Sequence, residues 1–114
     1  MIDFGTYKLK PDDEVLVIGL SGQLDTESCE YFLSCLEGEI KDGHIQLIVD
    51  CRNLEFISSM GLGMLLRAHS RMKKHGGDVK LARVGGTVAK VMQTVQLDKL
   101  LKIYPTVREA RATF

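Results

Sequence analysis

The sequence is poor in cysteine, and its few cysteines form no recognisable pair. Three are present in 114 residues, Cys29, Cys35 and Cys51, and none is part of a C-x-x-C motif. An odd number of cysteines without such a motif argues against a disulfide framework and fits a reducing compartment. A zinc site needs about four Cys or His ligands at close spacing, and the three histidines are scattered. We therefore expect no disulfide and no bound metal or cofactor.

Long hydrophobic runs are also missing. No stretch of about 18 apolar residues occurs, which excludes a membrane-spanning helix, and MIDFGTYKLK lacks the basic-then-apolar layout of a signal peptide. Hydrophobic residues make up 45% of the chain and charged residues 26%, which is typical of a globular protein. The length suits one domain over 1–114. We predict a single cytoplasmic domain with no insertion into a membrane.

The chain has no net charge, yet its charges are unevenly distributed. Residues 1–57 carry 4 basic and 12 acidic side chains, a net charge of −8, and residues 58–114 carry 11 and 3, a net charge of +8. Nucleic-acid modules usually combine a basic excess with aromatic side chains, but the basic half contains only Tyr104 and Phe114 as aromatics. We predict that the two halves pack together with complementary charges and that the protein does not bind nucleic acid.

The hydrophobic patterns predict four or five strands. Residues 2–10 and 14–20 are apolar and β-branched around the turn residues KPDDE, which indicates a hairpin. HIQLIVDC at 44–51 is almost continuously apolar, which is typical of a strand covered on both faces of a sheet. DVKLARV at 78–84 alternates apolar and polar residues, and KIY at 102–104 is a candidate edge strand.

Helical periodicity separates these strands. Helices are expected within 24–43, from about 60 to 75, within 85–95 and at 105–114. The side chains expected to face inward are Cys29, Phe32, Leu33, Leu36 and Ile40 in the first, Leu62, Leu65, Leu66 and Met72 in the second, and Val88, Val91, Met92 and Val95 in the third.

Residues typical of helix ends accompany these segments. Asp25 or Thr26 is the expected N-cap of the first helix and Thr87 that of the third, while Thr106 and Glu109 have the spacing of a capping box. The resulting order, ββαβαβα(β)α, predicts an α/β domain with a mixed sheet of four to five strands and about four helices.

The stretch FISSMGLGMLL, residues 56–66, places two serines directly before the second helix. Either serine can accept a hydrogen bond from an unpaired first-turn amide, which stabilises a helix by about 1 kcal/mol. The same amides and the helix dipole also favour a phosphate, which would add about −1.5 to −2 charges to a surface loop. Gly61 and Gly63 lower helix propensity by about 1 kcal/mol each, which indicates that a neighbouring group packs close to the backbone. That neighbour is either the sheet or a partner.

Motifs of enzymes are missing from this loop and helix. Ser59 is not in a G-x-S-x-G elbow, and GLGMLL neither completes G-x-G-x-x-G nor leads to a P-loop lysine. His69 falls in a mostly apolar band, so we expect a packed or half-buried histidine. Arg67, Arg71 and Lys74 share one helical face, which is either a solvated surface or a contact for an acidic partner. We expect no catalysis by this chain.

Nearly the whole chain resembles the STAS domain family, and within it the free-standing bacterial anti-sigma-factor antagonists. VLVIGLSGQLDTESCEYF is similar to the family's second strand, G-x-L-D segment and first helix. LIVDCRNLEFISSMGLGMLL is similar to its central strand, phosphorylation loop and second helix, and GGDVKLARVGGTVAKVMQTVQLDKLLKIYPTVREA follows the remainder in order. The motif of an apolar residue followed by D/S-S-S/A-G-L is fairly specific in this context.

The resemblance implies a partner-switching protein. Members of the family bind an anti-sigma factor that is also a serine kinase, and this binding frees the sigma factor. The kinase phosphorylates one serine of the antagonist, which abolishes binding, and a metal-dependent serine phosphatase reverses the modification. Aligning Gly61-Leu62-Gly63 with the family's G-L-G places Ser59 on the phosphorylated serine. Ser58, which stands where the family often has Asp, is a second candidate.

The same resemblance implies a docking face around the loop and the second helix. Asp25 matches the aspartate of G-x-L-D, which lies near the phosphorylation loop in that fold, and Met60 is bulkier than the usual residue. The expected partner-binding residues are Asp25, Ser58, Ser59, Met60, Gly61, Leu62 and Met64. Two alternatives remain open: a structural subunit of a transporter-associated or signalling complex, with the serines as caps only, and nucleotide binding, which no phosphate-binding motif supports.

Overall fold

The computed structural model describes residues 2–114 and contains one mixed sheet of five strands with four α-helices. The strands follow the order β1-β2-β3-β4-β5 across the sheet; β1 and β2 are antiparallel, and the other neighbours are parallel. The order ββαβαβα(β)α and the α/β class are thus confirmed. The strands are β1 (Ile2–Tyr7), β2 (Leu16–Leu24), β3 (Gln46–Ile57), β4 (Asp78–Ala82) and β5 (Ile103–Tyr104). The helices are α1 (Cys29–Lys41), α2 (Ser59–Lys74), α3 (Gly86–Thr94), the 3-10 turn η1 (Leu97–Lys99) and α4 (Val107–Ala112).

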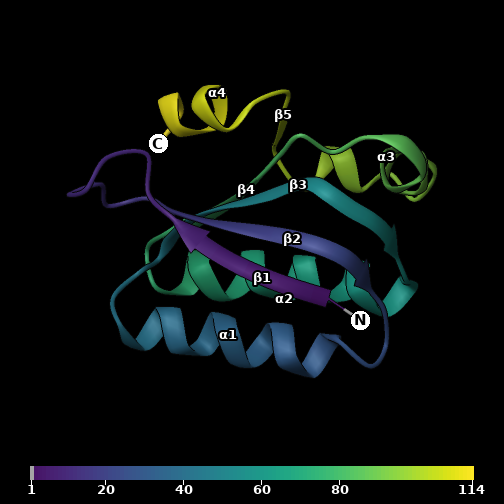
Figure 1. The fold of residues 1–114 in the computed structure, drawn as a ribbon, viewed down its shortest axis with the longest axis horizontal. Helices are drawn as coiled ribbons and strands as arrows, with labels where there is room; N and C mark the ends of the chain where they lie inside the picture. The colour runs from purple at the N-terminus through teal and green to yellow at the C-terminus, as the bar shows by residue number, and fades with distance from the viewer. Residues whose placement is uncertain (1) are drawn as a thin grey trace.

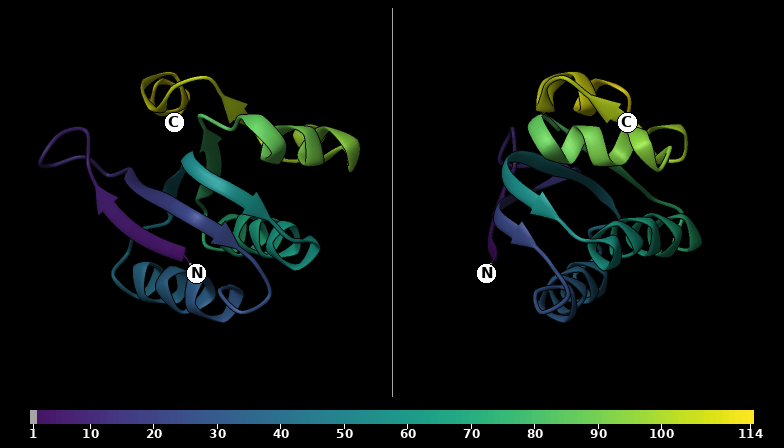
Figure 2. Two further views of the ribbon diagram at one scale, coloured as in Figure 1. Left: turned by 45° about the vertical axis from the view of Figure 1, so that its right-hand side comes forward. Right: turned by 90° about the vertical axis from the view of Figure 1, so that its right-hand side faces the viewer.

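Helices cover both faces of the sheet, but unequally. Helices α1 and α2 lie against one face and α4 against the other (Figure 1). The main core contains Phe32 of α1, Leu65 and Met72 of α2, and Met92 of α3, all fully buried. A smaller cluster joins α4 to the opposite face through Val107. Helix α4 packs mainly on β3, β4 and β5 and reaches Val17 of β2, so the same face over β1 is left without a helix (Figure 2).

Strand β3 lies in the middle of the sheet and is covered on both faces. Leu47 and Val49 point into the main core, whereas Ile48 joins the smaller cluster beneath α4. Lys80 on β4, which pairs with Ile48, is also buried, with its ammonium group 2.8 Å from the Thr113 carbonyl oxygen and over the ring of Phe114. Burial on both faces explains why the sequence of residues 44–51 is almost continuously apolar.

The acidic and basic halves of the chain are joined by ion pairs, as their complementary charges predicted. Each of three pairs links a carboxylate from residues 1–57 to an arginine from residues 58–114. They are Asp13–Arg111 at 2.9 Å, Glu37–Arg71 at 2.7 Å, and Asp50–Arg83, in which the guanidinium group donates to both carboxylate oxygens.

The three cysteines are unpaired in the structure. Cys29 and Cys51 are buried, and Cys35, on the outer side of α1, is partly exposed. Burial raises the pKa of the Cys51 thiol to about 12, so this group stays protonated and unreactive near neutral pH. Within residues 2–114, no helix has the length and apolar character needed to cross a membrane.

The largest difference from the sequence-based prediction concerns residues 52–56. The apolar pattern predicts a strand that ends at Cys51, but the segment RNLEF continues β3 as far as Ile57 and pairs with the second half of β2. Two irregularities in the register, between Gly19 and Ser21 and between Gly22 and Gln23, let the polar segment remain in the ladder. Strand β2 is correspondingly longer than predicted and ends at Leu24.

Several element ends also differ. The regular part of α1 begins after Ser28 rather than after Asp25 or Thr26, and Gly85, not Thr87, precedes α3. Val95, which we expected to face inward, is 52% exposed because α3 ends at the preceding residue. The remaining differences are in length: β1 and β4 end earlier than predicted, and η1 was not predicted.

Candidate functional site

Two hydrogen bonds of Ser58 hold the loop between β3 and α2 in place. Ser58 has an extended backbone conformation, and its hydroxyl accepts a hydrogen bond from the Gly61 N–H at 3.0 Å. Its own N–H donates to the Leu24 carbonyl oxygen at 2.9 Å, which ties this loop to the end of β2. Ser58 is therefore the N-cap of α2, as the cap interpretation predicted for one of the two serines.

Ser59 has a different environment. It is the first residue of α2 and is exposed, and within residues 2–114 its hydroxyl has no hydrogen-bond partner. The first turn of α2 contains no acidic side chain, so no negative charge of the helix itself opposes a phosphate there. The helix can thus keep its cap at Ser58 while Ser59 is modified.

The two glycines of the motif have opposite environments. A Cβ atom on Gly61 would lie 2.6 Å from the Leu24 carbonyl oxygen and 2.9 Å from Cγ1 of Ile57. The loop therefore needs glycine at this position for close packing against β2. A Cβ atom on Gly63 would meet nothing within 4 Å, and this residue is exposed. Packing within the domain therefore explains why residue 61 is glycine, but it does not explain why residue 63 is glycine.

Asp25 organises the neighbouring turn between β2 and α1. Its Oδ1 accepts from the Ser28 N–H at 3.0 Å and lies 2.7 Å from the Ser28 hydroxyl oxygen. These bonds lower the pKa of the Asp25 carboxyl group, so it is ionised at neutral pH. Because Leu24 contacts both Ser58 and the backbone at Gly61, the turn that starts at Asp25 lies beside the serine loop.

Exposed apolar side chains flank the two serines. Met60 is 51% exposed and is therefore a surface residue. Phe56, at the end of β3, is 46% exposed and was missed in the sequence, although it is a lone aromatic residue in a polar segment. Of the other expected contact residues, Leu62 is buried in the core and Met64 is partly buried. These two residues support the loop from inside, as Gly61 does.

His69 of α2 lies in a cluster of charged side chains at the start of β4. His69 is half-buried, as expected, and its Nε2 lies 3.4 Å from a carboxylate oxygen of Asp78, at the start of β4. Lys73 is 3.3 Å from the other oxygen of the same carboxylate. This histidine therefore belongs to an ion-pair cluster at the far end of α2 rather than to the serine loop.

Comparison with known proteins agrees with this geometry. A family profile described as STAS domain matches residues 7–110. The chain belongs to the STAS domain family. The match covers β2 to β5 and only the last residue of β1, together with the serine loop and all four helices except the end of α4. The fold resemblance seen in the sequence is thereby confirmed.

Similar STAS proteins have regulatory or transport-related names. The anti-sigma F factor antagonist of Paenibacillus polymyxa is 26% identical over 91 residues, which cover 79% of this chain and 78% of that protein. The Bacillus cell fate determinant SpoIIAA in its phosphorylated form aligns with a TM-score of 0.70 and 26% identity, covering 95% and 96% of the two chains. A sulfate transporter family protein of Wolinella succinogenes aligns with a TM-score of 0.77 and 16% identity, covering 93% and 88%, which shows a common fold alone.

Proposed function

We propose that this STAS protein is an anti-sigma factor antagonist that works in the cytoplasm by partner switching. In the unphosphorylated form it binds an anti-sigma factor that is also a serine kinase, and this binding frees a sigma factor. Phosphorylation of Ser59 by that kinase ends the binding, and a metal-dependent serine phosphatase restores it. The kinase holds the nucleotide and its metal ion, and the chain itself performs no catalysis. The name of the Paenibacillus relative and the likeness to a phosphorylated SpoIIAA support this proposal.

The observation that carries the proposal is the difference in hydrogen bonding between the two serines. Ser58 caps α2 with its hydroxyl, whereas the Ser59 hydroxyl is exposed and takes no part in the hydrogen bonds of residues 2–114. A kinase can reach Ser59 without opening the helix. Ser58, the second candidate acceptor, would lose its capping bond on modification.

The effect of a phosphate follows from its surroundings. Met60 and Phe56 offer exposed apolar surface beside Ser59, and Gly63 leaves part of the α2 surface without a side chain. A partner seated there would exclude water from the Ser59 hydroxyl. A phosphate adds about −1.5 to −2 charges and three strongly hydrated oxygens, and burying them without compensation is costly. The same charge is tolerated in the isolated domain because it lies at a helix N-terminus in water.

The proposal is tested by comparing binding of three variants to the anti-sigma kinase from the same cells. Ser59→Asp should weaken binding, and Ser59→Ala should bind like the wild-type protein but resist phosphorylation by the kinase. Ser70→Asp is the matched control, because Ser70 is an exposed serine of the same helix, about three turns further along. Equal binding by Ser59→Asp and Ser70→Asp, measured by titration calorimetry, would exclude a switch at Ser59.

A structural role in a larger assembly is the second candidate, because the same fold also occurs in a protein of the sulfate transporter family. In that case both serines contribute only to helix α2, and the exposed apolar side chains contact a fixed partner. Co-purification with transporter subunits, together with a Ser59→Asp variant that assembles normally, would support this role over partner switching.

A further inference from the structure

Strand β1 forms a long and regular edge of the sheet. The strand order places β1 and β5 at the two edges, and β5 has only two residues. By contrast, all six residues of β1 pair with β2 in unbroken register, from Ile2 opposite Gly22 to Tyr7 opposite Val17. Figure 2 shows this strand at the margin of the sheet, with β2 on its inner side only. A strand of this kind presents a row of outward-facing N–H and C=O groups.

The usual protections of an edge strand are missing from β1. Its sequence, IDFGTY, contains no proline, lysine or arginine, and its register has no bulge. The only charged residue is Asp3, which is exposed. Natural proteins block exposed edges with such features, so their absence from a regular edge indicates a strand that accepts another strand.

A hollow adjoins the beginning of this edge. It has a volume of about 400 Å³ and lies between the start of β1 and the start of α1. Tyr31, 56% exposed, forms one wall, and its ring packs edge-to-face on Phe4 of β1 with centroids 4.9 Å apart. Three of the six lining residues are acidic; the lining consists of Ile2, Asp3, Asp25, Glu27, Ser28 and Tyr31. A strand edge beside a helix, with a pocket between them, is the geometry that binds extended peptides by strand addition.

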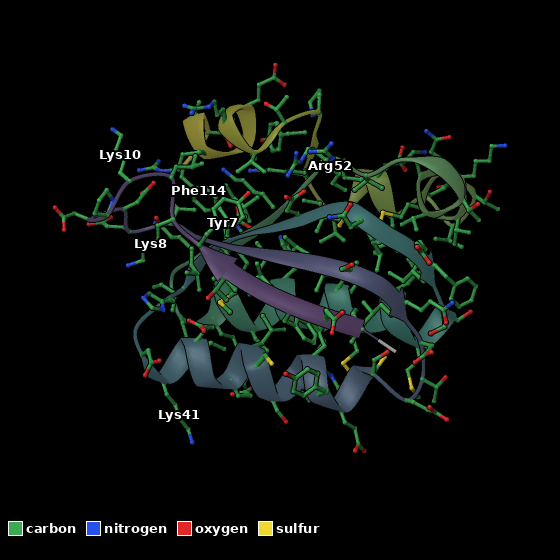
Figure 3. The ribbon with its side chains drawn as sticks, viewed as in Figure 1. Tyr7, Lys8, Lys10, Lys41, Arg52 and Phe114 are labelled. Atoms are coloured by element: carbon green, nitrogen blue, oxygen red, sulfur yellow. The ribbon has the colours of Figure 1, made fainter. Side chains whose placement is uncertain are left out.

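The charges of the residues that line the hollow indicate which kind of segment it can bind. Residues 1–57 contain only four basic side chains, and three of them, Lys8, Lys10 and Lys41, lie at the end of the domain away from the hollow (Figure 3). The described lining of the hollow itself contains acidic but no basic side chains, and it therefore complements a basic segment. A second copy of this chain is disfavoured, because its β1 would bring a second Asp3 to the same edge.

We propose that β1 binds an extended, basic segment of a partner protein as a sixth strand, with a lysine or arginine side chain placed in the hollow between β1 and α1. The backbone of β1 supplies the hydrogen bonds, and Asp3 and Glu27 supply the preference for positive charge. The hollow shares Asp25 with the turn beside the serine loop, so a partner bound at that loop can extend such a segment along β1. The strand addition itself does not require phosphorylation of Ser59 and can be tested separately from it.

The test uses the isotope-labelled full chain and two synthetic peptides of seven residues, one alternating valine with lysine and the other alternating valine with glutamate. NMR titration of the amide signals is expected to show shifts in residues 2–7 and 27–31 with the basic peptide and none with the acidic peptide. Raising the salt concentration should weaken the binding, because the charges are exposed. No shift in β1, or equal binding of both peptides, overturns the proposal.

Charge-reversed variants provide the matched control. The double variant Asp3→Lys/Glu27→Lys should weaken binding of the basic peptide roughly tenfold, as expected when two exposed attractions become repulsions. The control Asp12→Lys/Asp42→Lys changes the net charge equally at exposed positions outside the hollow and should leave the dissociation constant within about twofold. An equal loss in both double variants overturns the assignment of the hollow. Shifts in β1 that follow protein concentration without peptide overturn the proposal in favour of a second copy.

Discussion

Replacing each of the two adjacent serines with alanine should affect stability very differently. Ser58→Ala removes the hydroxyl that accepts the Gly61 N–H at 3.0 Å, and the alanine leaves that first-turn amide without its partner. Loss of an N-cap of this kind destabilises a protein by about 1 kcal/mol, within a range of roughly 0.5–2 kcal/mol. Ser59→Ala removes an exposed hydroxyl at the first helical position, so the expected change is within about 0.5 kcal/mol.

The two variants can be compared by thermal unfolding followed by circular dichroism at the helix band. For a domain of 114 residues, a loss of about 1 kcal/mol corresponds to a melting temperature lower by about 4 °C. We expect this decrease for Ser58→Ala and almost none for Ser59→Ala. If Ser59→Ala were the more destabilising variant, Ser59 would be the cap. The argument that its hydroxyl is available for modification would then be refuted.

Three further outcomes follow from the same structure. Gly61→Ala should destabilise the domain by at least about 1 kcal/mol in urea unfolding, because the new Cβ would overlap the Leu24 carbonyl. Gly63→Ala should stabilise α2 by about 0.5–1 kcal/mol while weakening partner binding, and unchanged binding would remove Gly63 from the docking face. Burial raises the pKa of the Asp50 carboxyl group, but the hydrogen bonds from Arg83 and from the Arg52 N–H, together with the positive charge of Arg83, outweigh burial and lower the net pKa. The stability gained from the ionised carboxylate is therefore present above the unfolded-state pKa and is lost as pH falls through the lower folded-state pKa. Asp50→Asn should therefore cost about 1–2 kcal/mol at neutral pH, and this difference should shrink in acid; a pH-independent difference would contradict the ion-pair account.

The order of elements could be predicted from the sequence because each element carries a local signal. The continuous apolar run of β3 indicates burial on both faces, and the caps Ser58 and Thr106 act through bonds to residues only three positions away. The second half of β3 could not be predicted in this way. Its polar residues 52–56 are held as a strand by pairing with β2 across two shifts of register, which depends on a partner distant in sequence.

The site was predictable only in part, for the same reason. The motif and the family resemblance indicate Ser59 and Asp25, but only the folded chain shows that Ser58 is the cap and that Leu24 joins the two loops. The exposure of Phe56 depends on which face of an irregular strand it occupies, which periodicity does not predict. The hollow beside β1 combines the start of β1, the turn that follows β2 and the start of α1, so no sequence motif marks it.

The measurement that tests the central claim most directly is peptide mapping by mass spectrometry of the protein isolated from its native cells under varied growth conditions. The account predicts one phosphate on the peptide that contains residues 57–66, located at Ser59 and gained or lost with the conditions. A phosphate on Ser58 would contradict the assignment of the acceptor. A peptide without any phosphate under all conditions would contradict the switch and make a structural role the better account of this STAS protein.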